Sequence, residues 1–303
     1  MPADLELIAA FEPFARTASE LAANARRYVV LDVFTDTPLE GNALAVFTDA
    51  RDLAPEVMQR IARELNLSET VFVLPPERGG DVRVRIFTPA EELPFAGHPV
   101  LGSASVVASA LQRPAVTLET PAALVALELR LDGERAAFGR MRQPLPTWRP
   151  YERSRELLAA LGVERSALPL EVYDNGPSYA YVELESEDAL AALAPDMRAL
   201  AELAPTCASC YAGSGERWKM RMFAPGAGVP EDPATGSAAG PLAVHLCRHG
   251  RVAFGTEVEI RQGAEIGRPS LLYARAQGSA ELLESVEVAG SAVIVASGSF
   301  RLG

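Results

Sequence analysis

Two stretches of this chain share one frame: "RIFTPAEELPFAGHPVLGSA" (residues 85–104) and "RMFAPGAGVPEDPATGSAAG" (residues 221–240). Both open Arg-x-Phe-x-Pro, reach a further proline at the same distance, and run into Gly-Ser-Ala. Upstream, "LAPEVMQRI" (residues 53–61) and "LAPDMRALA" (residues 193–201) recur in the same order, each with a proline where a helix is expected to begin. The spacing between the copies drifts only from 140 to 134 residues. The sequence therefore predicts a duplicated architecture.

The hydrophobic pattern predicts what each copy contains. "VRVRIF" (82–87) and "LVALELRL" (124–131) alternate as half-buried strands do, whereas "VFVLP" (71–75) is apolar throughout and is expected to be buried on both faces. The segments 97–112 and 236–250 read as helices that are apolar almost all round, and such helices belong inside a protein. We therefore expect an α+β fold of two pseudo-symmetric barrel-like halves, each a curved sheet around one buried helix, with the active site in the cleft between them.

Domain boundaries follow from the same landmarks. Residues 1–27 are expected to form an N-terminal extension, frayed or loosely helical. The first half is expected over residues 28–143, completed by C-terminal strands from about residue 285 to 303. The second half is expected over residues 144–284, after the proline-rich "QPLPTWRP" (143–150).

Composition limits the classes of function. The formal net charge of −12, with no basic run, argues against nucleic acid and anionic membrane surfaces as partners. No apolar stretch approaches the roughly 20 residues that a membrane-spanning helix needs. The first residues are acidic where a signal peptide is basic, so a cytoplasmic protein is expected.

Lysine and cysteine usage limits the cofactors. Lys219 is the only lysine, and no Gly-Lys-Ser/Thr phosphate loop occurs. Cys207 and Cys210, spaced C-x-x-C, together with His245 and His249 suggest zinc as an alternative. A long gap separates the two pairs, and histidines near the end of a helix also suit its dipole. We therefore do not favour a metal site.

Three ionisable residues stand out. Glu69 in "NLSETVF" lies at the mouth of the buried strand, where partial desolvation raises the pKa of a carboxyl group and makes it a stronger base. The alternative is an exposed loop glutamate with Ser68 as a cap. His98 and Asp232 precede or begin the two buried helices, and each alone is explained by helix capping. Two copies that converge on one cleft favour function, and paired helix N-termini favour a small carboxylate as the ligand.

Ser237 suggests a different enzyme class. With His98 and Asp232 it would complete a hydrolase triad. Ser237 is not in a Gly-x-Ser-x-Gly elbow, and its Gly-Ser-Ala setting recurs at Ser103. A Ser237-dependent hydrolase remains the less favoured alternative.

Four motifs together carry a family resemblance: "LEGNALAVF", "NLSETVFVLP", "RIFTPAEELPFAGHPVLGSA" and "EDPATGSAAGPLAVHL". From about Tyr28 to the C-terminus, the chain resembles the phenazine-biosynthesis isomerase family, PhzF, which is related to diaminopimelate epimerase. "MRQPLPTW", "YDNGPSYAYV" and "EIGRPSLLYA" strengthen the resemblance. The resemblance implies two pseudo-symmetric halves, no cofactor, and a homodimer.

The resemblance also implies a reaction, the isomerisation of trans-2,3-dihydro-3-hydroxyanthranilate in phenazine biosynthesis. It implies Glu69 as the general acid/base that moves a proton from C3 to C1, with His98, Asp232 and Ser237 as polar catalytic partners. The positions expected to hold the substrate are Asn42, Ser68, Gly97 and Gly236. Relatives that racemise amino acids use a cysteine at each helix start, and this chain has none there, which excludes two-thiol epimerisation. A related small cyclic carboxylate remains an alternative substrate.

Overall fold

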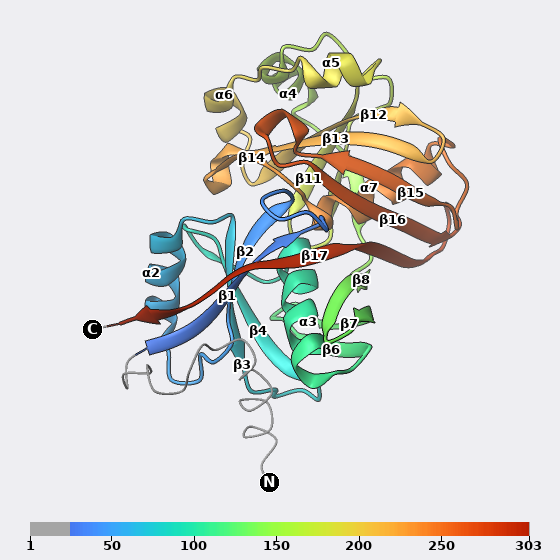
Figure 1. The fold of residues 1–303 in the computed structure, drawn as a ribbon. Helices are drawn as coiled ribbons and strands as arrows, with labels where there is room; N and C mark the ends of the chain where they lie inside the picture. The colour runs from blue at the N-terminus through green and yellow to red at the C-terminus, as the bar shows by residue number, and fades with distance from the viewer. Residues whose placement is uncertain (1–24, 303) are drawn as a thin grey trace. The chain divides into compact units, whose positions relative to one another are not determined.

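The computed structural model describes residues 25–302, and these form two compact units (Figure 1). The first unit contains the described residues up to Met141 and the C-terminal segment from Gly290, and the second contains Arg142–Ala289. Residues 25–27 belong to strand β1 (Ala25–Val33) because they pair with the end of β17 (Leu283–Arg301), so the expected extension is at most residues 1–24, which lie outside the described part. In the described part, no helix is both long and apolar enough to cross a bilayer.

The first unit is built around one curved sheet. Its strands follow the order β17–β1–β2–β3–β4–β6–β7–β8, and successive pairs are antiparallel, antiparallel, parallel, antiparallel, parallel, antiparallel and antiparallel. The remaining bounds are β2 (Asn42–Phe47), α2 (Pro55–Leu65), β3 (Glu69–Leu74), β4 (Val82–Phe87), β5 (Glu92–Leu93), α3 (Gly97–Leu111), β6 (Ala115–Glu119), β7 (Leu124–Asp132) and β8 (Arg135–Gln143).

The second unit repeats this arrangement. Its strands run β9–β10–β11–β12–β13–β15–β16–β17, with the same succession of antiparallel and parallel pairs. Its elements are β9 (Thr147–Pro150), α4 (Ser154–Leu161), β10 (Glu171–Asp174), β11 (Ser178–Glu183), α5 (Glu187–Ala191), α6 (Met197–Ala201), β12 (Thr206–Ser214), β13 (Arg217–Ala224), η3 (Pro225–Ala227), β14 (Val229–Asp232), α7 (Gly236–Arg248), β15 (Glu257–Gln262), η4 (Ala264–Ile266) and β16 (Ser270–Gly278).

Each unit encloses one helix, as the apolar segments predict. Residues Gly97–Ser109 of α3 are all buried, and the helix packs against β1, β2, β3, β4, β6 and β7 of its own sheet. Residues Gly236–Cys247 of α7 are likewise buried, and α7 packs against β16. The burial of these helices, which have almost no polar face, confirms the predicted α+β class with two barrel-like halves.

The predicted strands are confirmed in β3, β4 and β7, whose burial patterns match the expected continuous or alternating patterns. One helix start was wrong. Pro55 opens α2 as predicted, but α6 begins after Pro195, at Met197, because the Asp196 carboxylate accepts from the backbone N–H groups of Arg198 and Ala199, both at 3.0 Å.

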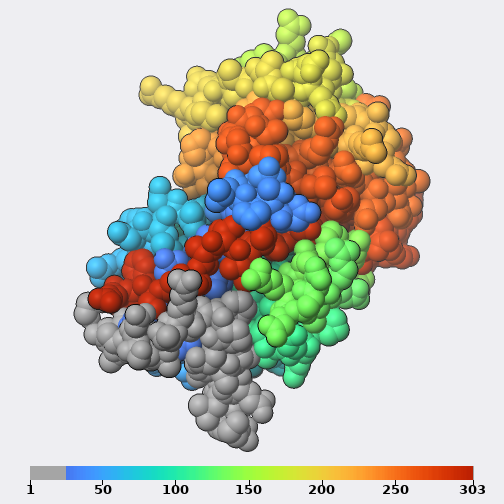
Figure 2. Space-filling view, in the orientation of Figure 1, coloured from blue at the N-terminus to red at the C-terminus, as the bar shows by residue number. Residues whose placement is uncertain are grey.

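The surface of the first unit includes part of β17. Residues Ala296 and Ser297 of that strand are exposed, as is the loop over residues 36–39. In the space-filling view the C-terminal segment (dark red) and the loop region (blue) both reach the visible face (Figure 2). Neither segment contains a predicted site residue.

Candidate active site

Glu69 is the first residue of β3. The preceding helix α2 ends at Leu65, and Asn66 adopts a left-handed conformation (φ 52°) that turns the chain toward the sheet. The Glu69 side chain is only 14% exposed. It is therefore not the exposed loop glutamate of the alternative interpretation, and Ser68 just before it is also partly buried.

Asn42 opens the neighbouring strand. Gly41 precedes it with φ +65°, and a Cβ at that position would lie 2.4 Å from the carbonyl oxygen of Val33, so the turn into β2 requires glycine. Strands β2 and β3 are parallel, with Leu44 opposite Glu69. Because parallel strands begin at the same edge of a sheet, Asn42 and Glu69 lie at one end of this unit.

His98 is the second residue of α3 and connects these two groups. Its Nδ1 atom lies 3.2 Å from Nδ2 of Asn42, and its Nε2 atom lies 3.2 Å from Oε2 of Glu69. The ring is 3% exposed, and burial lowers the pKa of His98 to about 3. The imidazole is therefore neutral at physiological pH.

The contact with Asn42 determines which nitrogen of His98 carries the proton. An amide nitrogen donates hydrogen bonds and does not accept them, so Nδ1 of the ring must be the acceptor. The proton of the neutral ring is then on Nε2, the atom that faces the Glu69 carboxylate. The Nε2 contact with Glu69 is close but lacks the alignment of a hydrogen bond. This geometry leaves the Nε2–H group available to an oxygen atom of a bound ligand.

Asp232 ends β14 in the second unit and is 5% exposed. Its Oδ2 atom accepts a hydrogen bond of 2.5 Å from the Thr235 hydroxyl group. Gln262 of β15 makes two hydrogen bonds to the segment between β14 and α7. Its amide group donates to the Asp232 carbonyl at 2.7 Å, and its Oε1 atom accepts from the Thr235 N–H at 3.0 Å. The Asp232 carboxylate is thus fixed just before α7 begins.

Ser237 lies in the first turn of α7, where its Oγ is 2.7 Å from the hydroxyl group of Tyr179. A hydrolase triad requires a histidine nitrogen as the acceptor for this hydroxyl group. Both ring nitrogens of His98 face other groups, Asn42 and Glu69. The geometry within each unit does not favour the Ser237-dependent hydrolase.

Gly97 and Gly236 are the first residues of α3 and α7. The N–H groups of the first helical turn have no acceptor within their own helix and carry the positive end of its dipole. The two Gly-Ser-Ala segments, however, are not equivalent. The second opens α7, whereas Ser103 of the first lies within the second turn of α3 and is fully buried.

The side chains that hold these residues in place were not predicted from the sequence. Gln262, Tyr179 and Asn175 all donate to, or contact, the segment from Asp232 to Ser237. Asn175 and Tyr179 stand within the quoted motif "YDNGPSYAYV", which was a usable signal. Gln262 stands in an ordinary strand pattern, and nothing in the sequence marks it.

The residues considered for zinc do not gather as that alternative required. His245 and His249 do lie together, but with Glu171 rather than with Cys207 and Cys210 among the described residues. The Glu171 carboxylate is already paired with the Arg248 guanidinium at 2.6 Å, and it also accepts from the Tyr173 hydroxyl group at 2.9 Å. A positive charge at that distance neutralises the carboxylate, so we interpret the group as a structural network.

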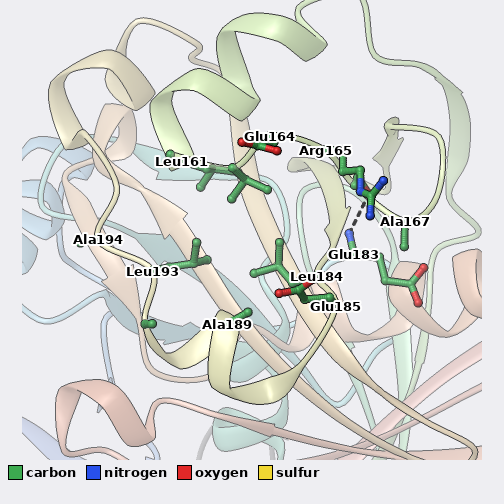
Figure 3. A pocket seen from close by; sticks show the side chains of 14 residues that line it. Leu161, Glu164, Arg165, Ala167, Glu183, Leu184, Glu185, Ala189, Leu193 and Ala194 are labelled. Atoms are coloured by element: carbon green, nitrogen blue, oxygen red, sulfur yellow. Dashed lines mark hydrogen bonds between the residues drawn. The ribbon is translucent and has the colours of Figure 1, made fainter.

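A pocket of about 960 Å³ lies elsewhere in the second unit (Figure 3). Leu161, Leu184 and Leu193 line it together with the charged residues Glu164 and Arg165. Glu183 in its wall is paired with Arg251 at 2.8 Å. The pocket contains none of the predicted site residues.

Comparison with known proteins agrees with the motifs. Residues 31–298 match the family described as phenazine biosynthesis-like protein, PhzC-PhzF. A trans-2,3-dihydro-3-hydroxyanthranilate isomerase of Pseudomonas fluorescens is 53% identical over 275 residues, which cover 91% of this chain and 99% of that protein. The protein of the same name from Pseudomonas aeruginosa is 53% identical over 273 residues, covering 90% and 98%.

Solved structures give the same result for the fold. The crystal structure of a Bacillus anthracis phenazine biosynthesis protein of the PhzF family superposes with a TM-score of 0.80 at 25% identity, and the match covers 92% of this chain and 99% of that one. With the motifs, the duplicated fold and these matches in agreement, the chain belongs to the PhzC-PhzF family of phenazine biosynthesis-like proteins.

Proposed function

We propose that this protein is a trans-2,3-dihydro-3-hydroxyanthranilate isomerase of phenazine biosynthesis. Relatives with that name are 53% identical and match nearly their whole length. The observation that carries the proposal is the position of the partly buried Glu69 carboxylate beside the neutral ring of His98. A carboxylate in that setting suits proton transfer to and from carbon, which needs a base that can return the proton.

In the proposed reaction Glu69 removes the hydrogen from C3 of the substrate ring and delivers it to C1. The C3–H bond breaks, the double bonds shift along the ring, and a C1–H bond forms. The hydroxyl group on C3 is then that of an enol, which tautomerises to a ketone. Atoms and charge balance within one substrate molecule, because the proton leaves and returns through a single carboxylate. The reaction requires no oxidant or reductant.

His98 acts in this scheme as a neutral hydrogen-bond donor. With a pKa of about 3 it is not an imidazolium at neutral pH, so it is a poor proton source. Its Nε2–H instead stabilises the ionised form of Glu69 or an oxygen of the substrate on which negative charge develops. Asn42 fixes the tautomer that makes this possible.

Five further residues remain predictions for the site: Asp232, Ser237 and Gly236 in the second unit, and Ser68 and Gly97 in the first. The first turns of α3 and α7 offer N–H groups suited to a carboxylate, which the substrate carries. The Asp232 carboxylate, held next to α7, is the proposed partner for the substrate amine. Mutation of these residues tests the assignment directly.

The proposed enzyme uses no cofactor and no metal, and it is a homodimer. A chelator-treated sample is expected to keep full activity, and loss of activity with removal of one metal ion per chain would contradict this. Sedimentation at micromolar concentration is expected to show a dimer, and a monomer alone would refute the homodimer. The cytoplasm is the proposed location.

The direct test of the function is to incubate the purified protein with trans-2,3-dihydro-3-hydroxyanthranilate and to follow its ultraviolet absorbance. We expect the substrate band to disappear and coupled products of the isomer to accumulate. Binding without any turnover would instead favour an isomerase for another small cyclic carboxylate. Hydrolysis of simple esters would favour the hydrolase.

A further inference from the structure

Helix α7 contains a proline in its interior. Pro241 is the sixth residue of the helix that begins at Gly236. Proline has no backbone N–H and its ring presses on the carbonyl group four residues earlier, so a proline at this position leaves that carbonyl without its helical donor. In α7 that carbonyl belongs to Ser237. It lies in a buried part of the helix, where an unsatisfied carbonyl group is costly.

Asn175 supplies the missing donor. Its Nδ2 atom donates to the Ser237 carbonyl oxygen at 3.0 Å, and the side chain is buried. Asn175 stands in the turn between β10 and β11, far from α7 in the sequence. The donor that Pro241 removes from within the helix is therefore replaced from the sheet.

Two neighbouring carbonyl groups of the same turn also accept from side chains, but they do not depend on them. Gln143 Nε2 donates to Gly236 O at 2.8 Å, and the Tyr181 hydroxyl group donates to Ala238 O at 2.6 Å. Within an α-helix these two carbonyl groups also accept hydrogen bonds from the N–H groups four residues later, which here belong to non-proline residues. Only the Ser237 carbonyl has lost that donor to a proline.

The equivalent helix of the first unit needs no such replacement. Its proline, Pro99, is the third residue of α3, where the missing N–H is one that a helix never uses internally. The side-chain donor is thus specific to the second copy. In the repeat, Pro99 corresponds to Pro233, and the position of Pro241 corresponds to Val107, which keeps its N–H group.

We infer that Asn175 is a positioning residue for the proposed active site. By satisfying the carbonyl that Pro241 leaves open, it fixes the first turn of α7, including the Ser237 hydroxyl group and the Gly236 N–H. Without that donor, the first turn would rotate to find another partner. The inference rests on the proposed function, because Ser237 and Gly236 are proposed members of that site.

The experiment compares four full-length proteins: wild type, Asn175→Ala, Pro241→Ala and the double variant. Each is assayed for kcat and KM with trans-2,3-dihydro-3-hydroxyanthranilate, and its thermal unfolding is measured. Loss of one buried hydrogen bond predicts that Asn175→Ala reduces kcat/KM about tenfold. Pro241→Ala restores an N–H to the helix, so the double variant is expected to recover to within about threefold of wild type.

Tyr181→Phe is the matched control. It removes a hydrogen bond from the adjacent carbonyl, which keeps its helical donor, so its kcat/KM is expected to change less than that of Asn175→Ala. A double variant as slow as Asn175→Ala, or an Asn175→Ala protein with unchanged kcat/KM, would overturn the inference. Rescue of unfolding temperature without rescue of kcat/KM would also overturn it, because the role would then be structural only. Failure of the proposed function is seen separately, as absence of turnover by wild type.

Discussion

Nε2 of His98 lies 3.2 Å from Oε2 of Glu69, and this contact joins two elements that are separate in the sequence. Glu69 opens β3 and His98 stands in the first turn of α3. On its other side the ring contacts Asn42 at the start of β2. Three element starts therefore meet at one end of the first unit. Because the Asn42 amide donates to Nδ1, the proton of the neutral ring is on Nε2, the atom that faces Glu69.

The first prediction concerns the charge and tautomer of His98. Nitrogen NMR is expected to show that the His98 ring stays neutral, with its proton on Nε2, down to about pH 4. Because the folded pKa lies below the unfolded value, the unfolded chain binds more protons between these values. This group therefore reduces stability as the pH falls from about 6.5 toward 3.

Asn42→Asp tests the cause of that tautomer. A carboxylate accepts where the amide donates, so it would draw the proton to Nδ1 and raise the pKa of His98. We expect the Nε2–H signal to be lost in the neutral ring and turnover to fall by at least tenfold. An unchanged tautomer in this variant would show that Asn42 does not determine it.

The second prediction concerns Glu119, a fully buried carboxylate. Burial raises its pKa, but backbone N–H groups of Glu77, Gly80 and Arg78 donate to it, and together they hold the pKa below its usual value. Glu119→Gln is expected to lower the unfolding temperature at pH 7. A carboxyl group whose pKa is lower in the folded than in the unfolded protein stabilises the fold when the pH is above the unfolded pKa. This stability is lost as the pH falls through the folded pKa.

The measurement is the unfolding temperature of wild type and Glu119→Gln from pH 7 to pH 3. The difference between the two proteins is expected to shrink toward the acid end, since the wild-type carboxyl group is then protonated as well. A difference that stays constant with pH would mean that the carboxylate charge contributes nothing. Glu128→Gln, at an exposed position of β7, serves as the control.

The third prediction separates the two enzyme classes at Ser237. Ser237 is proposed to act as a hydrogen-bonding residue beside Tyr179. The Ser237→Ala variant is therefore expected to bind substrate more weakly or to turn it over more slowly, yet to keep measurable activity. A hydrogen bond to a charged group is worth about 1.5–3 kcal/mol, which corresponds to roughly a ten- to hundredfold effect. Complete inactivation together with stoichiometric labelling by a fluorophosphonate would instead identify a serine nucleophile.

Much of the fold was predictable from sequence because the chain repeats itself. Repeated prolines and Gly-Ser-Ala segments indicated two copies, and apolar helices indicated two buried centres. The repeat did not show that Gly-Ser-Ala occupies different turns of α3 and α7. The predicted helix starts at residues 97 and 236 are confirmed as the first residues of α3 and α7, although neither Ala96 nor Thr235 forms a side-chain cap there.

The arrangement of the candidate site was predictable only in part. Glu69 and His98 stand in long motifs at the starts of elements, where chemistry-bearing side chains are expected. The contact between Asn42 and His98 depends on strand register and helix placement, which single-sequence patterns do not define. Gln262 and Asn175 act through hydrogen bonds to backbone groups across the fold, and such partners leave no periodic signal.

The length of the Glu69 side chain is also predicted to matter. Glu69→Asp withdraws the carboxylate by one methylene group, and misplacement of a reacting group by about 1 Å costs on the order of a hundredfold in rate. We expect kcat to fall by about that factor, with KM little changed. A near wild-type kcat for this variant would argue that the carboxylate does not contact the reacting carbon atoms.

The central claim is that the Glu69 carboxylate moves the carbon-bound proton, and turnover by Glu69→Gln tests it most directly. The amide keeps the size and hydrogen bonding of the side chain but is not a base, so substrate is expected to bind almost normally. The measurement is the initial rate with trans-2,3-dihydro-3-hydroxyanthranilate at saturating concentration, compared with the rate of wild type. The comparison requires that the variant and wild type have equal unfolding temperatures. We predict less than about 1% of the wild-type rate, as the loss of a general base predicts. A Glu69→Gln protein that retains a tenth or more of the wild-type rate would contradict the account.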